Sequence, residues 1–315
     1  MKFTKFTSGA ALAVVLAPGV LSAPASLENR QAPVTDLDVL QFALTLEHLE
    51  NVFYKNALQQ FSQADFLAAG FSSSFYQNLL FIAHDEEAHV QFLQQAITSA
   101  GGTPVVACEY NFPYTDVVSF VALSSVLEGV GVSAYLGGAP VISSKDILAA
   151  AGAILVAEGL HQSVQRTAIL EAASANIVGT PVPPSAIFSI ASAFLKSCPS
   201  SNAALPFQAF PTLTLNTANP SPPGVIAAFT FDQSLPLSST LFVTFVSGLD
   251  IISVSAQVTS AGVVTAAIPQ KAQGQIYAML TNVEVSSSIA DSAIVAGPAI
   301  IEVTPPSPTV DFSVS

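Results

Sequence analysis

Two stretches decide the fold of this chain: Ala-Leu-Thr-Leu-Glu-His-Leu-Glu-Asn-Val-Phe-Tyr at residues 43–54 and His-Asp-Glu-Glu-Ala-His at residues 84–89. Each lies in a long segment whose apolar residues recur near helical spacing. In the second stretch Glu86 precedes His89 by three residues, and positions three apart share one face of a helix. This pair can therefore direct a carboxylate and an imidazole to the same place.

The same spacing recurs once more, and two other apolar segments each supply one glutamate. Glu158 precedes His161 by three residues, Glu47 lies in the first stretch, and Glu128 lies in a third segment. Carboxylate oxygens and imidazole nitrogens suit iron and manganese, and this ligand inventory is typical of a dinuclear site inside a four-helix bundle. We therefore predict two Fe or Mn ions as cofactors. The predicted ligands are Glu47, Glu86, His89, Glu128, Glu158 and His161.

Two tyrosines repeat the spacing of the lone glutamates. Tyr54 follows Glu47 by seven residues, and Tyr135 follows Glu128 by seven residues. Seven residues are about two helical turns, so each tyrosine lies on the stripe of its glutamate and is a candidate neighbour of the ligands. Plain core aromatics are the alternative. Glu50 lies on a similar face and is either a further neighbour or the first helix's ligand in place of Glu47.

A buried polar network without metal is the alternative to the metal site, with each histidine paired to a carboxylate. Burying several carboxylates without cations costs free energy, which favours the metal. Of the remaining polar residues in the two stretches, His84 and Glu87 are expected to face solvent or to lie beside the ligands. His48 is turned by about 100° from Glu47 on a helix and is expected at the surface or at an interface.

Residues 35–200 are predicted to form an α-helical bundle. Four main helices and a short fifth are expected at about 35–62, 72–100, 115–138, 143–174 and 183–198. The longest connection, 103–114, joins the second and third helices, which favours a ferritin-like topology over a simple up-and-down bundle. The third and fourth helices are apolar enough to be mistaken for membrane spans. Each carries a glutamate, which a lipid-facing helix avoids, so we expect no transmembrane segment in the mature chain.

Residues 201–315 have a different composition, rich in Ser, Thr, Pro and β-branched residues. Short apolar runs are separated by Gly, Pro, Ser or Asp, which predicts a separate, small β-sandwich-like domain. The runs are 225–231, 240–246, 251–258, 263–268, 275–280 and 299–303. This part of the sequence contains no His and no Cys, so we expect it to stabilise the bundle or to contact a partner.

The amino terminus has the order of a secretory signal. Lys2 and Lys5 precede an apolar run at 9–21, and small residues follow. The run is shorter than the roughly 20 residues that span a bilayer, although an amino-terminal anchor is the alternative. We expect residues 1–25 to be a signal peptide and residues 26–34 a linker or pro-segment. The mature protein would be secreted, either extracellular or in the cell wall.

Secretion would place the two cysteines of the chain in an oxidising environment. An oxidising compartment pairs thiols, so Cys108 and Cys198 are predicted to form a disulfide. Two independent buried thiols are the alternative.

Charge is scarce in this sequence and mostly negative. The chain of 315 residues has 8 Lys and Arg against 21 Asp and Glu, a formal charge of −13, and only 9% of its residues are charged. Eight scattered basic residues do not make a phosphate-binding surface, so nucleic acid is excluded as a partner. With 51% hydrophobic residues, disorder is excluded as well. Apolar outer faces on the helices are compatible with a homodimer.

The sequence resembles a known family at the motifs quoted above. The stretches at 43–54 and 84–89 are similar to those of the ferritin-like domain of secreted fungal stress-response proteins and plant desiccation-related proteins. The resemblance covers about 35–198, and the β-rich tail also fits the fungal members. It implies a link to stress or development without implying one reaction.

Better-known ferritin-like proteins differ from this chain in ways that narrow the function. Rubrerythrins carry a four-cysteine iron module, whereas this chain has two cysteines. Cage-forming ferritins have short single-domain subunits, whereas about 110 residues follow the bundle here. The resemblance leaves two functions open. One is a di-iron or di-manganese oxidoreductase, catalase-like or ferroxidase-like, that acts on peroxide or O₂. The other is a non-enzymatic stress protein with a structural or vestigial metal site, whose β domain contacts the cell wall.

Overall fold

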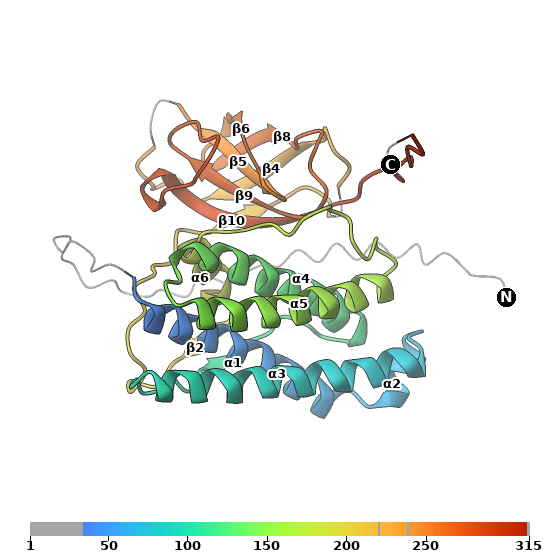
Figure 1. The fold of residues 1–315 in the computed structure, drawn as a ribbon. Helices are drawn as coiled ribbons and strands as arrows, with labels where there is room; N and C mark the ends of the chain where they lie inside the picture. Colours follow the sequence, from blue (N-terminus) through green and yellow to red (C-terminus); the bar gives the residue numbers. More distant parts are fainter. Residues whose placement is uncertain (1–33, 220, 238–239, 314–315) are drawn as a thin grey trace.

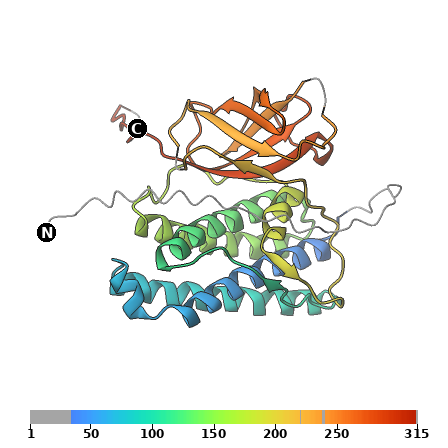
Figure 2. The same ribbon diagram turned by 180° about the vertical axis from the view of Figure 1, so that it is seen from behind.

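The computed structural model describes residues 34–219, 221–237 and 240–313. A helical bundle forms one layer and a β-sandwich lies against it, as Figure 1 shows from one side and Figure 2 from behind. This arrangement confirms the predicted helical bundle followed by a β-sandwich. The proposed signal peptide and almost all of the proposed linker lie outside the described residues.

Four long helices make the bundle. They are α1 (Asp36–Gln60), α3 (Ser73–Ser99), α4 (Val117–Gly138) and α5 (Lys145–Ala168). Each begins after a side chain that accepts a hydrogen bond from the backbone N–H three residues later, which satisfies a donor that the helix leaves open. The capping residues are Thr35, Ser72, Asp116 and Ser144.

Three helix predictions were wrong in detail. A short helix, α2 (Gln63–Ala68), lies in the connection between α1 and α3, where none was predicted. The helix predicted to reach residue 174 ends at Ala168, because Leu170 adopts a positive φ of 65° and the side chain of Arg166 bonds to the carbonyl of Ala172. The fifth helix, α6 (Pro184–Ser192), ends earlier than predicted because the chain continues into a strand.

The helices pair as α1 with α3 and α4 with α5, and residues 100–116 join the two pairs. This connection is tied to the chain that follows α6. The strand β1 (Glu109–Tyr110) pairs with β2 (Leu195–Ser197), and a disulfide joins Cys108 to Cys198. The predicted disulfide is therefore present, and it fixes the crossover to the far end of the helical region.

Two antiparallel four-stranded sheets form the β-sandwich. One has the order β10-β9-β5-β6 and the other β3-β4-β8-β7. The strands are β3 (Leu213–Leu215), β4 (Ile226–Phe231), β5 (Phe242–Ser247), β6 (Asp250–Ser255), β7 (Gln257–Ser260), β8 (Val263–Ala267), β9 (Gly274–Thr281) and β10 (Ile294–Val303). The run predicted at 251–258 is divided between β6 and β7, which belong to different sheets. β3 was not predicted.

The first of these sheets packs directly on the bundle. Side chains of β9 and β10, such as Tyr277 and Ile294, belong to the same apolar core as the bundle helices. The Tyr277 hydroxyl forms a hydrogen bond of 2.8 Å with Ser133 on α4. Arg166 on α5 donates two hydrogen bonds, 2.7 and 2.8 Å long, to Glu302 on β10. The β domain thus supports the two helices that carry Glu128, Glu158 and His161.

Two helical segments are long and apolar enough to cross a membrane, judged by length and composition alone: Val117–Val141 and Lys145–Ala168. The core helix of a soluble protein passes the same test. Glu128 and Glu158 on these helices are buried inside the bundle. The absence of a transmembrane segment therefore stays a prediction.

Candidate metal centre

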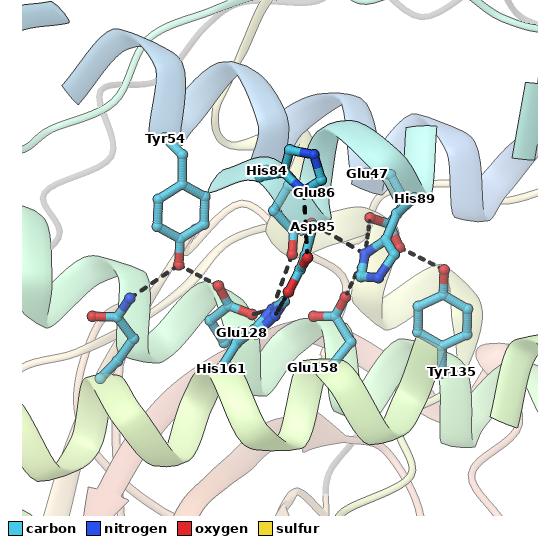
Figure 3. A network of polar contacts seen from close by, with 11 residues as sticks. Glu47, Tyr54, His84, Asp85, Glu86, His89, Glu128, Tyr135, Glu158 and His161 are labelled. Carbon is cyan, nitrogen blue, oxygen red and sulfur yellow. Dashed lines mark hydrogen bonds and ion pairs between the residues drawn. The ribbon is translucent and has the colours of Figure 1, made fainter. Parts of the chain in front are cut away.

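All six predicted ligands lie together in the middle of the bundle (Figure 3). Each of the four long helices contributes to the cluster, because each places one side chain, or a pair three residues apart, on its inward face. The contributions are Glu47 from α1, Glu86 and His89 from α3, Glu128 from α4, and Glu158 and His161 from α5. The carboxylates of Glu86, Glu128 and Glu158 are completely buried.

The six side chains form two overlapping groups of four, and in each group the potential ligand atoms lie within 4.8 Å of one another. One group consists of Glu47, Glu86, His89 and Glu158; the other consists of Glu86, Glu128, Glu158 and His161. Glu86 and Glu158 belong to both groups. The geometry is that of two adjacent sites, each with one histidine and one carboxylate of its own and with two carboxylates in common.

Each histidine directs the same ring nitrogen into the cluster. Nδ1 of His89 lies 3.2 Å from Glu47 and 3.6 Å from both Glu86 and Glu158. Nδ1 of His161 lies 3.0 Å from Glu86 and 3.3 Å from Glu128. The Nε2 atom of His161 lies 3.3 Å from the Asp85 carboxylate. A carboxylate on the outer nitrogen fixes the tautomer and the ring orientation of a metal-binding histidine.

The buried oxygens of the two shared carboxylates are poorly satisfied by the protein. Among the described residues, neither oxygen of Glu86 or of Glu158 accepts a well-aligned hydrogen bond, and neither does Oε2 of Glu128; the two histidine Nδ1 atoms lie only at ion-pair distances from these carboxylates. Burying an anion without such partners costs several kcal/mol, and a cation between the carboxylates offsets that cost. These oxygens and the two Nδ1 atoms fit a pair of cations such as Fe or Mn.

The pKa values of the cluster reflect its excess of buried negative charge. Burial, and then the charge of Glu47, raise the pKa of Glu86 to about 7. Burial and the charge of Glu86 also raise the pKa of Glu158 well above its ordinary value. Burial by itself lowers the pKa of His89, but its contacts with Glu47 and Glu86 outweigh burial and raise that pKa to about 10. The protein alone therefore retains protons where two metal ions would supply positive charge.

The two tyrosines cross between the helix pairs. The Tyr135 hydroxyl on α4 donates a hydrogen bond of 2.5 Å to Glu47 on α1. The Tyr54 hydroxyl on α1 donates to Glu128 on α4 and also accepts a hydrogen bond from Gln165. Each tyrosine thus contacts the lone glutamate of the other helix pair, as Figure 3 shows, and both lie beside the predicted ligands.

Glu50 is buried beside the cluster but belongs to neither group of four. Gly131 makes room for it, since a Cβ atom there would lie 2.4 Å from Oε2 of Glu158 and 3.2 Å from Oε1 of Glu50. Burial and the charges of neighbouring glutamates raise the pKa of Glu50 well above its ordinary value. Between Glu47 and Glu50, the structure places Glu47 among the potential ligands.

The other polar residues of the two stretches have different places. Glu87 is about half exposed and pairs with Lys55 at 2.8 Å, and His84 is exposed beside Asp85. His48 was expected at the surface or at an interface, and the surface position was wrong, because this side chain is buried and its Nε2 lies 3.0 Å from the carbonyl of Val105 in the same chain. That carbonyl belongs to the crossover connection, whose path the helical periodicity does not reveal.

Three residues near the cluster were not singled out from the sequence. Asp85 could have been found, since it directly precedes Glu86 in the motif. Gln165 lies four residues after His161 and therefore on the same helix face, which is a weaker signal. Gly131 carried no signal, because its role depends on two side chains from other helices.

Comparison with known proteins agrees with this arrangement. Residues 35–171 match the family model described as the Ferritin-like domain. The chain is also similar to Protein rds1 of Schizosaccharomyces pombe, with 27% identity over 194 residues. That alignment covers 58% of this chain and 45% of the relative, so the chain spans less than half of the relative's length. The matched segment contains every predicted ligand, and residues 35–171 are accordingly a ferritin-like domain.

Proposed function

We propose that the bundle binds two Fe or Mn ions, one in each group of four side chains, with Glu86 and Glu158 shared between them. The observation that carries this proposal is the overlap of the two groups at these two residues. Glu86 and Glu158 are also the residues whose two buried oxygens both lack a well-aligned hydrogen bond in the described part of the chain.

The surrounding residues would orient the ligands. Tyr135 binds Oε1 of Glu47, which leaves Oε2 beside His89. Tyr54 binds Oε1 of Glu128, which leaves Oε2 beside His161. Asp85 holds the outer nitrogen of His161, so that Nδ1 remains directed into the cluster. These contacts reduce the freedom of the side chains before any ion binds.

A pair of redox-active ions would supply electron exchange with peroxide or O₂, and we propose that the protein is an oxidoreductase of this class. The alternative is a non-enzymatic stress protein in which the ions serve as a structural clamp. The cluster is buried, and helix α5, which carries Glu158 and His161, is attached to the β domain through Arg166. Both features make the site rigid, and a rigid site suits an enzyme and a structural clamp alike.

We further propose that the protein is secreted. The basic, apolar and small-residue order at the amino terminus supports this proposal, and so does the Cys108–Cys198 disulfide, because disulfides persist in oxidising compartments. The β domain would then be available to contact the cell wall or a second copy of the chain.

Metal analysis of Glu86→Gln beside Glu87→Gln tests the metal proposal. The two residues are neighbours on α3, but only Glu86 is buried in the cluster. We expect about two ions per chain for the wild type and for Glu87→Gln, and fewer than about half an ion for Glu86→Gln, since removing one shared carboxylate affects both sites. Equal metal content in the two variants would contradict the proposal.

Peroxide consumption by the metal-loaded protein separates the enzyme from the clamp. An enzyme should consume peroxide catalytically, with turnover lost in Glu86→Gln and retained in Glu87→Gln. Metal binding without turnover of peroxide or O₂ would favour the structural alternative.

A further inference from the structure

A cavity of about 220 Å³ lies between the four long helices, next to the metal centre. Its wall is almost entirely apolar, with side chains such as Leu46 from α1, Leu93 from α3, Ala134 from α4 and Ile154 from α5. Four of the lining residues carry polar side-chain groups: Glu47, Glu50, Tyr135 and Asp146. A small apolar cavity with a few polar groups is the usual form of a ligand site.

The polar groups mark an outer and an inner end. Asp146 is exposed at the start of α5, and Phe92 on α3 is 46% exposed, so the wall reaches the surface between these two helices. The carboxylates of Glu47 and Glu50 are buried at the other end of the lining. A molecule in the cavity would therefore extend from the surface toward the middle of the bundle.

The inner end contains a buried carboxylate to which no described residue forms a hydrogen bond. Glu47 is already engaged by Tyr135 and His89. Glu50 is only 5% exposed. Its oxygens are not among the completely enclosed atoms that lack a partner, and the hydrogen bonds found between described residues at this end of the cavity involve Glu47 and not Glu50. A buried polar group of this kind is costly unless something else satisfies it. Glu50 also stands outside both groups of potential metal ligands.

We propose that this cavity binds an uncharged molecule with a hydrocarbon body and one hydroxyl group, and that the hydroxyl forms a hydrogen bond with Glu50. An apolar cavity of about 150 Å³ holds benzene. Scaling that volume to about 220 Å³ gives a body of about nine carbon atoms. The hydrocarbon would lie along the leucine, isoleucine and alanine side chains.

The charge of the inner end decides the type of polar group. Two carboxylates, Glu47 and Glu50, line this end, so a ligand with its own carboxylate would be repelled. An ammonium group would lose its hydration, and burying a charge costs much more than burying a hydroxyl. A hydroxyl can donate to a carboxylate and can also accept from a carboxylic acid, so it suits Glu50 in either form.

This inference goes beyond metal binding and does not depend on it. The cavity lining contains Glu47 from one group of four, whereas Glu86, Glu128 and Glu158 are not part of it. Ligand binding should therefore be measurable both in the protein as purified and after chelation. Metal content measured in the same samples keeps the two proposals separate.

Calorimetric titration with three matched nine-carbon probes tests the proposal: hydrocinnamyl alcohol, propylbenzene and hydrocinnamate. The alcohol should bind at least about tenfold more tightly than hydrocinnamate, and more tightly than propylbenzene, because only the alcohol satisfies Glu50 without adding a negative charge. Hydrocinnamate binding as tightly as the alcohol would overturn the proposal. Equal binding of propylbenzene and the alcohol would overturn the role of Glu50.

Two alanines on α5 provide a matched pair of variants. Ala151 lines the cavity, whereas Ala153 is exposed and does not line it. Ala151→Leu should weaken binding of the alcohol by at least about tenfold, because the larger side chain occupies the cavity, while Ala153→Leu should change it by less than about twofold. Ala43→Leu on α1 fills the cavity from the opposite side and serves if Ala151→Leu does not fold.

The outcomes separate the cavity from the metal centre. Alcohol binding that Ala151→Leu removes, in protein that takes up no Mn²⁺ or Fe²⁺ even when either ion is supplied in excess, would support the cavity and contradict the metal proposal. Two ions per chain with no alcohol binding would support the metal proposal and contradict the proposed ligand site in the cavity. Alcohol binding that is unchanged in both Ala151→Leu and Ala43→Leu would overturn the proposed location.

Discussion

The hydroxyl of Tyr135 on α4 donates a 2.5 Å hydrogen bond to Glu47 on α1, and the same relationship recurs in reverse between Tyr54 on α1 and Glu128 on α4. Each tyrosine lies two helical turns from the glutamate of its own helix but binds the glutamate of the facing helix. The two contacts tie the helix pairs together on both sides of the cluster (Figure 3). They give the centre an approximate two-fold symmetry.

Tyr135→Phe should weaken metal binding. The change removes the donor to Oε1 of Glu47, and losing an outer partner of a ligand typically lowers metal affinity by about 10- to 100-fold. Competition titration with Mn²⁺ or Fe²⁺ measures the effect. Tyr114→Phe is the control, because the Tyr114 hydroxyl has no hydrogen bond to any described residue. Equal affinities for the two variants would show that the tyrosine contact does not orient Glu47.

Gly131→Ala should disrupt the cluster. A Cβ atom at this position would lie 2.4 Å from Oε2 of Glu158, which forces a shared carboxylate to move. We expect loss of at least one ion per chain and destabilisation by about 1–3 kcal/mol from overpacking. Metal analysis and urea unfolding measure the two effects.

Gly152→Ala is the matched control on α5, because nothing lies within 4 Å of its Cβ position. This change should retain both ions and stabilise the protein by about 0.5–1 kcal/mol through helix propensity. A Gly131→Ala variant that behaves like Gly152→Ala would contradict the tight packing around Glu158.

Stability should depend on pH through Glu171, which lies 3.3 Å from Arg166 at the contact between the domains. Burial and the charge of Glu302 raise the pKa of Glu171 to about 7, although Arg166 opposes the shift. A carboxyl with a raised pKa in the folded state contributes stability below its ordinary pKa. That contribution is lost as the pH rises toward 7.

Glu171→Gln should remove this dependence. The variant should be more stable than the wild type at pH 8 by about 1–2 kcal/mol, allowing for partial solvent screening, and the difference should vanish near pH 4. Urea unfolding across this range, with chelator present throughout, measures it. Glu87→Gln, at an exposed carboxyl, should follow the wild type. A difference between Glu171→Gln and wild type that does not change with pH would contradict the account.

Removing the disulfide should destabilise the protein. The bond joins residues that are 90 positions apart, and closing a loop of that length contributes about 4.6 kcal/mol in the chain-entropy model. Cys108→Ser combined with Cys198→Ser should lower the urea midpoint while the ligand cluster remains able to bind metal. An unchanged midpoint would show that the crossover connection is held by its other contacts.

The sequence predicted the cluster well because its signals are local. A spacing of three residues places Glu86 with His89 on one helix face. The seven-residue spacing likewise places Tyr54 on the same face as Glu47, whichever helices pack against that face. The choice between Glu47 and Glu50 needed the structure, since both point in similar directions from α1. The cavity also had no local signal, because four helices contribute to its wall.

The errors arose where the path of the chain depends on distant contacts. His48 is buried because the crossover connection brings Val105 to it from 57 positions away. The run at 251–258 is divided at Ala256, which lies between the end of β6 and the start of β7. The backbone N–H of Ala256 donates a hydrogen bond to the carbonyl of Leu241. The end of α5 at Ala168 had no glycine to mark it, since Leu170 takes the positive φ there.

The most direct test of the dinuclear centre is anomalous diffraction from crystals of the protein loaded with Mn²⁺ or Fe²⁺. We predict two peaks inside the bundle. One should lie among Glu47, Glu86, His89 and Glu158, and the other among Glu86, Glu128, Glu158 and His161. Paired metal sites in proteins lie about 3.5–4 Å apart, so the two peaks should be separated by a similar distance. A single peak in the cluster, or none in protein that is saturated with metal, would contradict the account.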